Sequence, residues 1–285
     1  MRRFIMLVLA DLLLAAGCRL AASPATAPTA TWAVAPAPTP IVYPSATAGV
    51  SARPSQAPGD DGGWELLRPG LERRHLSVQA AEGTVMESVY VLRIDPVAFR
   101  FDVAYRLGAP QTLAEWQAQT GALVVVNGGY FTAEWIATGL IVSAGQASGR
   151  SYQGFGGMFA IGPAGPEVRW LAERPHDPAE PLQAAVQAFP MLVVAAAPTS
   201  IEEDFQQARR TVVGQDAQGH ILILVAGSGT FTLARLSQFL AASDLGLTAA
   251  LNLDGGPSSG ILLAEPAEGV PAFSPLPAVI TVFPK

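Results

Sequence analysis

The sequence predicts a single folded domain of the α+β class, with a mixed, mainly antiparallel β-sheet core flanked by helices. Three observations support this class. Several short segments alternate apolar and polar residues, which is typical of half-buried strands. Turn signals rich in Gly, Pro, Asn and Asp separate them. Two longer segments instead have the start signals and apolar spacing of helices. We find no repeat of solenoid period.

Residues 1–17 have the anatomy of a secretory signal peptide. Arg2 and Arg3 precede an apolar stretch that is short for a membrane span. Small residues then lead to Cys18, the only cysteine. The stretch LAAGC resembles the lipobox of bacterial lipoproteins, which implies that Cys18 carries a lipid and becomes the first residue of the mature protein. An ordinary cleaved signal and an uncleaved anchor are the alternatives.

Residues 18–62 are dominated by Ala, Pro, Thr and Ser, with too few large apolar residues to build a core. We interpret them as a disordered linker that holds a domain off the membrane. The folded domain is expected over residues 63–285, at the cell envelope on the outer face of a bacterial membrane, or secreted. A net charge of −6 makes nucleic acid a poor partner.

Two strands, a helix and a third strand are predicted at the start of the domain. Residues 88–94 and 99–105 alternate as half-buried strands do, and Asp95 and Pro96 form a turn signal between them. Thr112 and Glu115 have the spacing of a capping box, so we expect a helix to begin there. Residues 122–126 then have the composition of a buried strand.

The second half of the domain is predicted as a hairpin, a helix and two strands. Residues 210–214 and 221–225 flank a turn as a hairpin. Residues 232–246 form an amphipathic pattern that places Leu233, Leu236 and Leu240 on one face, with Gly246 as the stop. The segments 249–253 and 277–283 are expected to be strands.

Two stretches share a pattern, VVVNGGYF at 124–131 and LNLDGGPSS at 251–259. In each, an apolar strand leads to one polar side chain and then to Gly-Gly. One interpretation is two tight turns, because Asn-Gly and Asp-Gly are strong hairpin signals. The other is that a buried strand fixes the polar residue while the glycines let a ligand approach the backbone. Backbone N–H groups, with the hydroxyls of Ser258 and Ser259, would then bind an anion.

A third stretch, QQARRTVVG at 206–214, brings Arg209 and Arg210 into a strand. An arginine with alternating apolar neighbours is often a solvated residue at a sheet edge. If one of the two points inward, its planar guanidinium suits a phosphate or a carboxylate.

Taken together, NGGYF, RRTVVG and LNLDGGPSSG resemble the phosphodiester glycosidase family, over about residues 63–283. The resemblance implies that Asn127, Arg210 and Asp254 occupy active-site positions. It also implies supporting turns at Gly128, Gly129, Gly255 and Gly256. Pro257 stands where the family often has a third glycine.

The resemblance implies an exported bacterial glycosidase that hydrolyses the bond between a sugar anomeric carbon and a phosphodiester, on an envelope or extracellular glycan. Breaking this bond develops positive charge on the ring and negative charge on the phosphate. Asp254 would stabilise the first charge, and Arg210 with backbone donors the second. Glu134 is the nearest candidate for a second carboxylate, or else an exposed loop residue. No cofactor is expected.

Two other classes of function are alternatives. A serine hydrolase built on Ser228, Ser258 or Ser259 lacks a convincing base, because all three histidines are better explained as surface residues. They do not resemble a zinc site either, although a structural divalent ion stays open. The other class is a non-catalytic envelope lipoprotein module that binds a glycan or a cell-wall polymer. An exposed aromatic platform would favour such a module, and convergence of the three candidate residues on one site would favour an enzyme.

Overall fold

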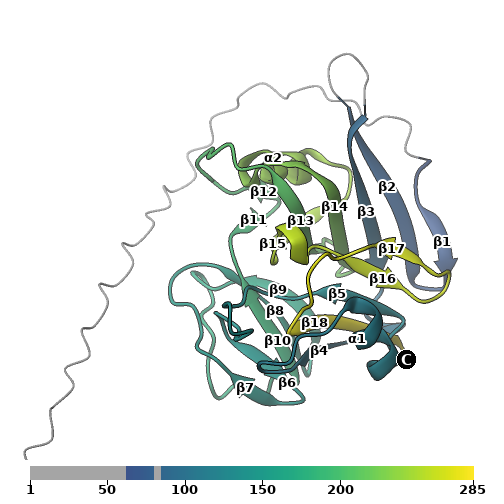
Figure 1. Ribbon diagram of the computed structural model, residues 1–285. Helices are drawn as coiled ribbons and strands as arrows, with labels where there is room; N and C mark the ends of the chain where they lie inside the picture. The colour runs from purple at the N-terminus through teal and green to yellow at the C-terminus, as the bar shows by residue number, and fades with distance from the viewer. Residues whose placement is uncertain (1–61, 80–84) are drawn as a thin grey trace, which may run out of the picture. The chain divides into compact units, whose positions relative to one another are not determined.

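The computed structural model describes residues 62–79 and 85–285, and its secondary structure is mostly β (Figure 1). These residues form three sheets in which every paired strand is antiparallel, with only two α-helices. The predicted helix-flanked α+β fold with a mixed sheet is therefore wrong. The predicted signal peptide, Cys18 and the linker up to residue 61 lie outside the described residues.

The first sheet contains both of the strands that lead to the candidate charged residues. Its spatial order is β1 (Glu65–Arg68), β2 (Leu71–Gln79), β3 (Val85–Ile94), β14 (Ile221–Phe231), β13 (Ala208–Asp216), β15 (Leu247–Asn252), β11 (Met191–Val194) and β12 (Ala197–Pro198). Strands β13 and β14 form the predicted hairpin. Val212 pairs with Asn252 across β13 and β15, so the RRTVVG and LNLD stretches are neighbours in the sheet.

The other two sheets have five strands each. The second sheet has the order β7 (Gln146–Ser148), β6 (Ile141–Ser143), β10 (Ala184–Ala188), β8 (Gly157–Gly162) and β9 (Gly165–Trp170). The third has the order β17 (Glu268–Val270), β16 (Ile261–Leu263), β5 (Val124–Asn127), β18 (Ala278–Pro284) and β4 (Phe99–Tyr105).

The largest cluster of buried apolar side chains takes members from all three sheets. Leu92 comes from the first sheet, Phe159 from the second and Phe101 from the third, and all three are at most 2% exposed. The rings of Phe101 and Phe159 meet edge to face, with centroids 5.8 Å apart. The sheets therefore bury much of their apolar surface against one another. Antiparallel neighbours also need no helical crossovers, which explains why so few helices are present.

Helix α1 (Leu113–Thr120) begins at the predicted capping box. The Thr112 hydroxyl accepts a hydrogen bond from the Glu115 N–H at 3.2 Å, and the Glu115 carboxylate accepts one from the Thr112 N–H at 2.8 Å. Trp116 lies on the buried face of the helix, and its indole N–H donates to the Leu276 carbonyl at 2.9 Å. The cap and this anchor fix α1 against the third sheet.

Helix α2 (Leu233–Ala242) begins after Thr232, whose hydroxyl accepts from the Arg235 N–H. It buries Leu236 and Leu240 in a cluster shared with the first sheet, as the amphipathic pattern predicts. The helix ends at Ala242, before the predicted stop at Gly246. Within residues 62–79 and 85–285, no helix has the length and apolar character needed to span a membrane.

Candidate active site

The candidate residues lie where strands of two sheets end. Asn127 is the last residue of β5 in the third sheet, and Asp254 follows β15 of the first sheet by two residues. The next strand after β5 is β6 of the second sheet, and the next after β15 is β16 of the third. Neither Gly-Gly stretch therefore joins paired strands, and the hairpin interpretation is wrong for both.

Asn127 is fully buried and links these strand ends. Its Oδ1 accepts hydrogen bonds from the Thr211 hydroxyl at 2.7 Å and from the Gly260 N–H at 3.1 Å. Its Nδ2 donates to the backbone carbonyl of Asp254 at 2.8 Å. The side chain thus joins β5 to β13 and holds the backbone that presents the Asp254 carboxylate. Asn127 is a positioning residue in this arrangement.

We expect Asn127→Ala to lower the free energy of unfolding by about 2 kcal/mol, measured by chemical denaturation. The change leaves three buried hydrogen-bonding groups without their partner, although water in the new cavity would satisfy some of them. Thr211→Val removes only one donor to Asn127 and should cost less. An Asn127→Ala protein that is as stable as the wild type but inactive would contradict the positioning role.

Asp254 presents a half-buried carboxylate held from one side by the backbone. Its Oδ1 accepts from the Gly255 N–H at 2.9 Å, and its own N–H donates to the Gly128 carbonyl at 3.1 Å. Burial raises the pKa of Asp254 above its ordinary value of 3.8, while hydrogen bonds from the Ser258 hydroxyl and the Gly255 N–H act in the opposite direction. Ionised Asp254 is therefore costly to the folded protein.

The raised pKa has a consequence for stability that can be measured. A carboxyl group whose pKa is higher in the folded than in the unfolded state stabilises the fold below pH 3.8, and this contribution is lost as the pH rises through the raised pKa. We therefore expect Asp254→Asn to be more stable than the wild type at pH 7, with an advantage that shrinks as the pH falls through the raised pKa and is gone below pH 3.8. Urea denaturation at several pH values measures this difference. An advantage that grows on acidification would contradict it.

Arg210 lies near the start of β13 and is 8% exposed. Its Nε donates to the Phe231 carbonyl at 3.2 Å, and its Nη2 to the Gln206 carbonyl at 2.7 Å. Its Nη1 lies beside the turn after Asp254, where a Cβ on Gly255 would come within 3.8 Å of it. Burial lowers the pKa of Arg210. One guanidinium nitrogen is thus directed toward the turn that carries the Asp254 carboxylate.

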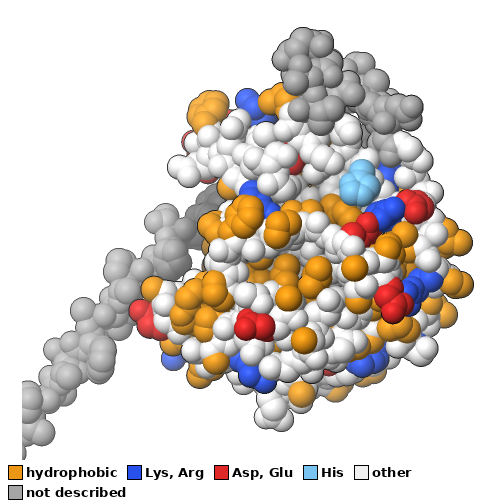
Figure 2. Space-filling model, turned by 45° about the vertical axis from the view of Figure 1, so that its right-hand side comes forward, with side chains coloured by type: hydrophobic (Ala, Val, Ile, Leu, Met, Phe, Trp, Pro, Cys, Tyr) orange, Lys and Arg blue, Asp and Glu red, His pale blue; other side chains and the backbone are white. Residues whose placement is uncertain are grey.

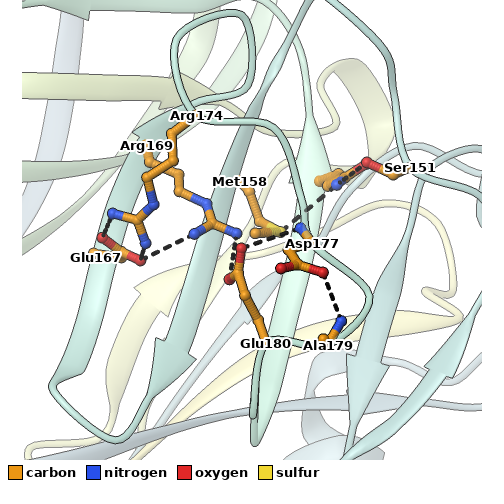
Figure 3. Close-up of polar contacts among 9 residues, drawn as sticks. Ser151, Met158, Glu167, Arg169, Arg174, Asp177, Ala179 and Glu180 are labelled. Carbon is orange, nitrogen blue, oxygen red and sulfur yellow. Dashed lines mark hydrogen bonds and ion pairs between the residues drawn. The ribbon is translucent and has the colours of Figure 1, made fainter.

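Arg210 differs from the other buried arginines in the described part of the chain. Arg74 forms an ion pair with Asp244 at 3.0 Å, and Arg169 forms one with Glu180 at 2.7 Å (Figure 3). On the surface too, basic and acidic side chains lie next to each other (Figure 2). Arg210 has no carboxylate within ion-pair distance among the described residues. The Asp204 carboxylate acts on its charge only from beyond that distance. A buried cation without an ion-pair partner is costly, so the arrangement favours an anionic ligand at this position.

The predicted supporting glycines lie around Asp254. Gly128 accepts the Asp254 N–H and Gly255 donates to the carboxylate. At Gly129, a Cβ would come within 2.5 Å of the Gln187 carbonyl, so only glycine permits this close approach of two sheets. Gly256 begins the short 3-10 helix η1 (Gly256–Ser258) with a φ of +59°, which also favours glycine.

Three predicted residues remain, the two serines that follow the Asp254 turn and Glu134. Ser258 lies in η1, where its hydroxyl is 3.4 Å from that of Ser274 and acts to lower the pKa of Asp254. Ser259 is fully buried, and its hydroxyl has no protein partner in the described structure. Glu134 is exposed in the turn after Phe131 and forms no hydrogen bond or ion pair with Asn127, Arg210 or Asp254 in this part of the chain. The structure thus shows no contact of Glu134 with these three residues, and its role as a second carboxylate stays a prediction.

The rival chemistries gain no support from the described residues. Ser228 is exposed, and its backbone N–H donates to the buried Glu87 carboxylate at 2.8 Å. Across residues 62–79 and 85–285, no histidine bonds to Ser228, Ser258 or Ser259. No three His, Cys, Asp or Glu side chains gather as metal ligands there.

Two residues of the site were not predicted from the sequence. Asn252 is fully buried, and its Nδ2 donates to the Tyr130 hydroxyl at 2.6 Å and to the Phe189 carbonyl at 3.0 Å. The Tyr130 hydroxyl also donates to the Phe189 carbonyl at 2.8 Å. Tyr130 belongs to NGGYF and lies three residues after Asn127, and Asn252 belongs to LNLD and lies two residues before Asp254. This closeness in sequence was the signal that could have identified them. Phe189, which follows β10, brings the second sheet to the site.

Residues 120–283 match the profile of the phosphodiester glycosidase family. No curated protein matches the chain. The catalytic domain of zebrafish N-acetylglucosamine-1-phosphodiester alpha-N-acetylglucosaminidase, auto-inhibited by its pro-peptide, is similar with a TM-score of 0.62 and 20% identity, over 76% of this chain and 85% of that chain. A hypothetical protein from Synechocystis has a TM-score of 0.52 and 15% identity, over 76% and 62% of the two chains.

Proposed function

Because the chain belongs to the phosphodiester glycosidase family, we propose that it hydrolyses the bond between the anomeric carbon of a sugar and a phosphodiester. One observation carries this proposal. The guanidinium of Arg210 is buried and has no carboxylate partner in the described residues. Its free nitrogen lies beside the turn that holds Asp254. A phosphodiester supplies the anion that this position lacks.

The two charged groups suit the two halves of the reaction. The bond between the anomeric carbon and the phosphate oxygen breaks, and its electron pair leaves with the phosphate. Asp254 stabilises the positive charge that develops on the sugar ring, and Arg210 stabilises the charge on the phosphate. Water then adds to the anomeric carbon and releases a proton. Since phosphate is a good leaving group, the reaction depends less on a strong general acid than ordinary glycoside hydrolysis does.

The substrate is proposed to be a phosphorylated glycan of the cell envelope or extracellular space. The zebrafish protein carries N-acetylglucosamine-1-phosphodiester in its name, which makes the matching methyl phosphodiester a suitable first probe. The test measures release of free sugar by the purified full chain from the methyl phosphodiesters of N-acetylglucosamine 1-phosphate and glucose 1-phosphate. Methyl glycosides without phosphate serve as controls.

Release of sugar from a phosphodiester, without cleavage of the methyl glycosides, is the expected result. Absence of release from all probes would overturn the proposal. The second candidate would then apply, a non-catalytic envelope module that binds a glycan or a cell-wall polymer. The exposed ring of Phe189 favours this candidate, because aromatic surfaces are typical of carbohydrate-binding sites.

We further propose that the protein is exported and held at the membrane by a lipid on Cys18. The support is the LAAGC stretch after a short apolar segment. Cys18→Ser should move an otherwise normal protein from the membrane fraction to the soluble fraction, because the lipid anchor is lost. A Cys18→Ser protein that stays with the membrane would instead indicate an uncleaved N-terminal anchor.

A further inference from the structure

Four aromatic side chains form one cluster beside the candidate site, and we call this cluster the aromatic platform. Its members are Tyr130, Tyr152, Phe155 and Phe189. The ring centroid of Phe189 lies 4.6 Å from that of Tyr130, 5.6 Å from that of Tyr152 and 5.9 Å from that of Phe155. Phe189 is the most accessible member, at 38% exposed, and the other three are partly exposed. The platform therefore presents an apolar, uncharged surface to solvent.

The aromatic platform is attached directly to the candidate active site. Asn252, two residues before Asp254, donates hydrogen bonds to the Tyr130 hydroxyl and to the Phe189 carbonyl. Burial and the negative charge of Asp254 raise the pKa of Tyr130, while the charge of Arg210 lowers it. Both charged groups of the site are thus close enough to Tyr130 to act on it. A ligand that contacts Asp254 has the platform next to it.

Hydrogen bonds to neighbouring residues also hold the platform in place. The Tyr152 hydroxyl forms a hydrogen bond with the Thr138 hydroxyl at 2.8 Å. The backbone N–H of Tyr152 donates to the Gln187 side-chain oxygen at 2.9 Å. Gln187 is buried and donates in turn to the Ser151 hydroxyl at 2.8 Å. Rings fixed in this way lose little conformational entropy when a ligand binds.

We propose that the aromatic platform binds one face of the sugar ring whose anomeric bond is cleaved. This inference rests on the proposed function. With the phosphate at Arg210 and the anomeric carbon at Asp254, the ring has to extend away from Arg210. One face of a pyranose ring carries mainly C–H groups, which pack on aromatic rings, while the hydroxyl groups at its edge stay hydrated. The uncharged platform suits the sugar better than it suits the charged phosphate.

The test measures KM and kcat of the full chain with the methyl phosphodiester of N-acetylglucosamine 1-phosphate. We expect Phe189→Ala to raise KM about tenfold with little change in kcat, and Phe155→Ala to act in the same direction. Phe189→Trp keeps an aromatic face and should restore most of the binding. Phe283→Ala is the matched control, because Phe283 is a partly exposed phenylalanine away from the site. It lies at one end of β18, whereas Val279 at the other end pairs with Asn127. Thermal unfolding shows whether each variant is folded.

A second phosphodiester with the same sugar and a uridine group in place of methyl identifies the part of the substrate that is bound. An equal rise in KM for both probes is expected. Two results would contradict sugar binding by the aromatic platform and leave the proposed function intact. One is a rise in KM confined to the uridine probe. The other is that Phe189→Ala and Phe155→Ala have the same KM as Phe283→Ala. If the wild type cleaves neither probe, the proposed function fails, and the inference fails with it.

Discussion

Asp254→Asn is expected to slow sugar-phosphodiester hydrolysis at least about a hundredfold, which corresponds to roughly 2.7 kcal/mol of lost transition-state stabilisation. Asparagine keeps the size of the side chain and an oxygen that accepts the Gly255 N–H, but it removes the negative charge. Because the fold does not depend on that charge, the variant should remain folded. Initial rates and thermal unfolding on the same preparation test both parts.

Asp216→Asn is the matched control for this change. Asp216 is also a buried aspartate, but it lies at the end of β13 in the hairpin turn, where it bonds to His220 at 2.8 Å. Its loss should lower stability and leave the rate per folded molecule close to that of the wild type. An Asp254→Asn protein that is both stable and active would remove the carboxylate from the mechanism.

Arg210→Met should also lower the rate at least about a hundredfold, because it removes the buried cation beside the Asp254 turn that is placed to bind the departing phosphate. Its effect on stability should be small. The variant loses hydrogen bonds to the carbonyls of Phe231 and Gln206, but it also removes a buried charge that has no ion-pair partner among the described residues. Rates at saturating substrate, together with urea denaturation, measure the two effects.

Arg169→Met is the matched control for this change, because Arg169 is equally buried but paired with Glu180 and Glu167. It should have the opposite effect, with a nearly normal rate and a loss of about 1–2 kcal/mol in stability. The loss is expected because Glu180 is left without its cation, while Glu167 keeps its ion pair with Arg174. If Arg210→Met is active, or destabilises the fold as much as Arg169→Met does, Arg210 is a structural residue.

The local features of the site could be predicted from the sequence, and so could the family. The pattern of an apolar strand, one polar residue and Gly-Gly identified Asn127 and Asp254, and the paired arginines identified Arg210. These signals are local, because a buried strand and a glycine turn each follow from a few adjacent residues. The role of Asn127 could not be read in this way. Its partners Thr211 and Gly260 are 84 and 133 residues away along the chain.

The sheets were harder to predict than the single strands. Strands β8 and β10 of the second sheet consist largely of Gly and Ala with a few large residues, and both residue types have a low preference for strands. None of the strands predicted from the sequence belongs to this sheet, and the predicted share of helix was therefore too high. Phe189 was missed for the same reason, since its place at the site depends on how β10 packs.

The hydrogen bonds of Asn127 also constrain the order in which the site can form during folding. The bond to Thr211 spans 84 residues and the bond to Asp254 spans 127, so no short segment of the chain contains a working site. Contacts of such long range close slowly and depend on the assembly of whole sheets. Enzymatic activity should therefore return only in the last kinetic phase of refolding, after most of the β-structure has formed, and a partly folded intermediate should be inactive.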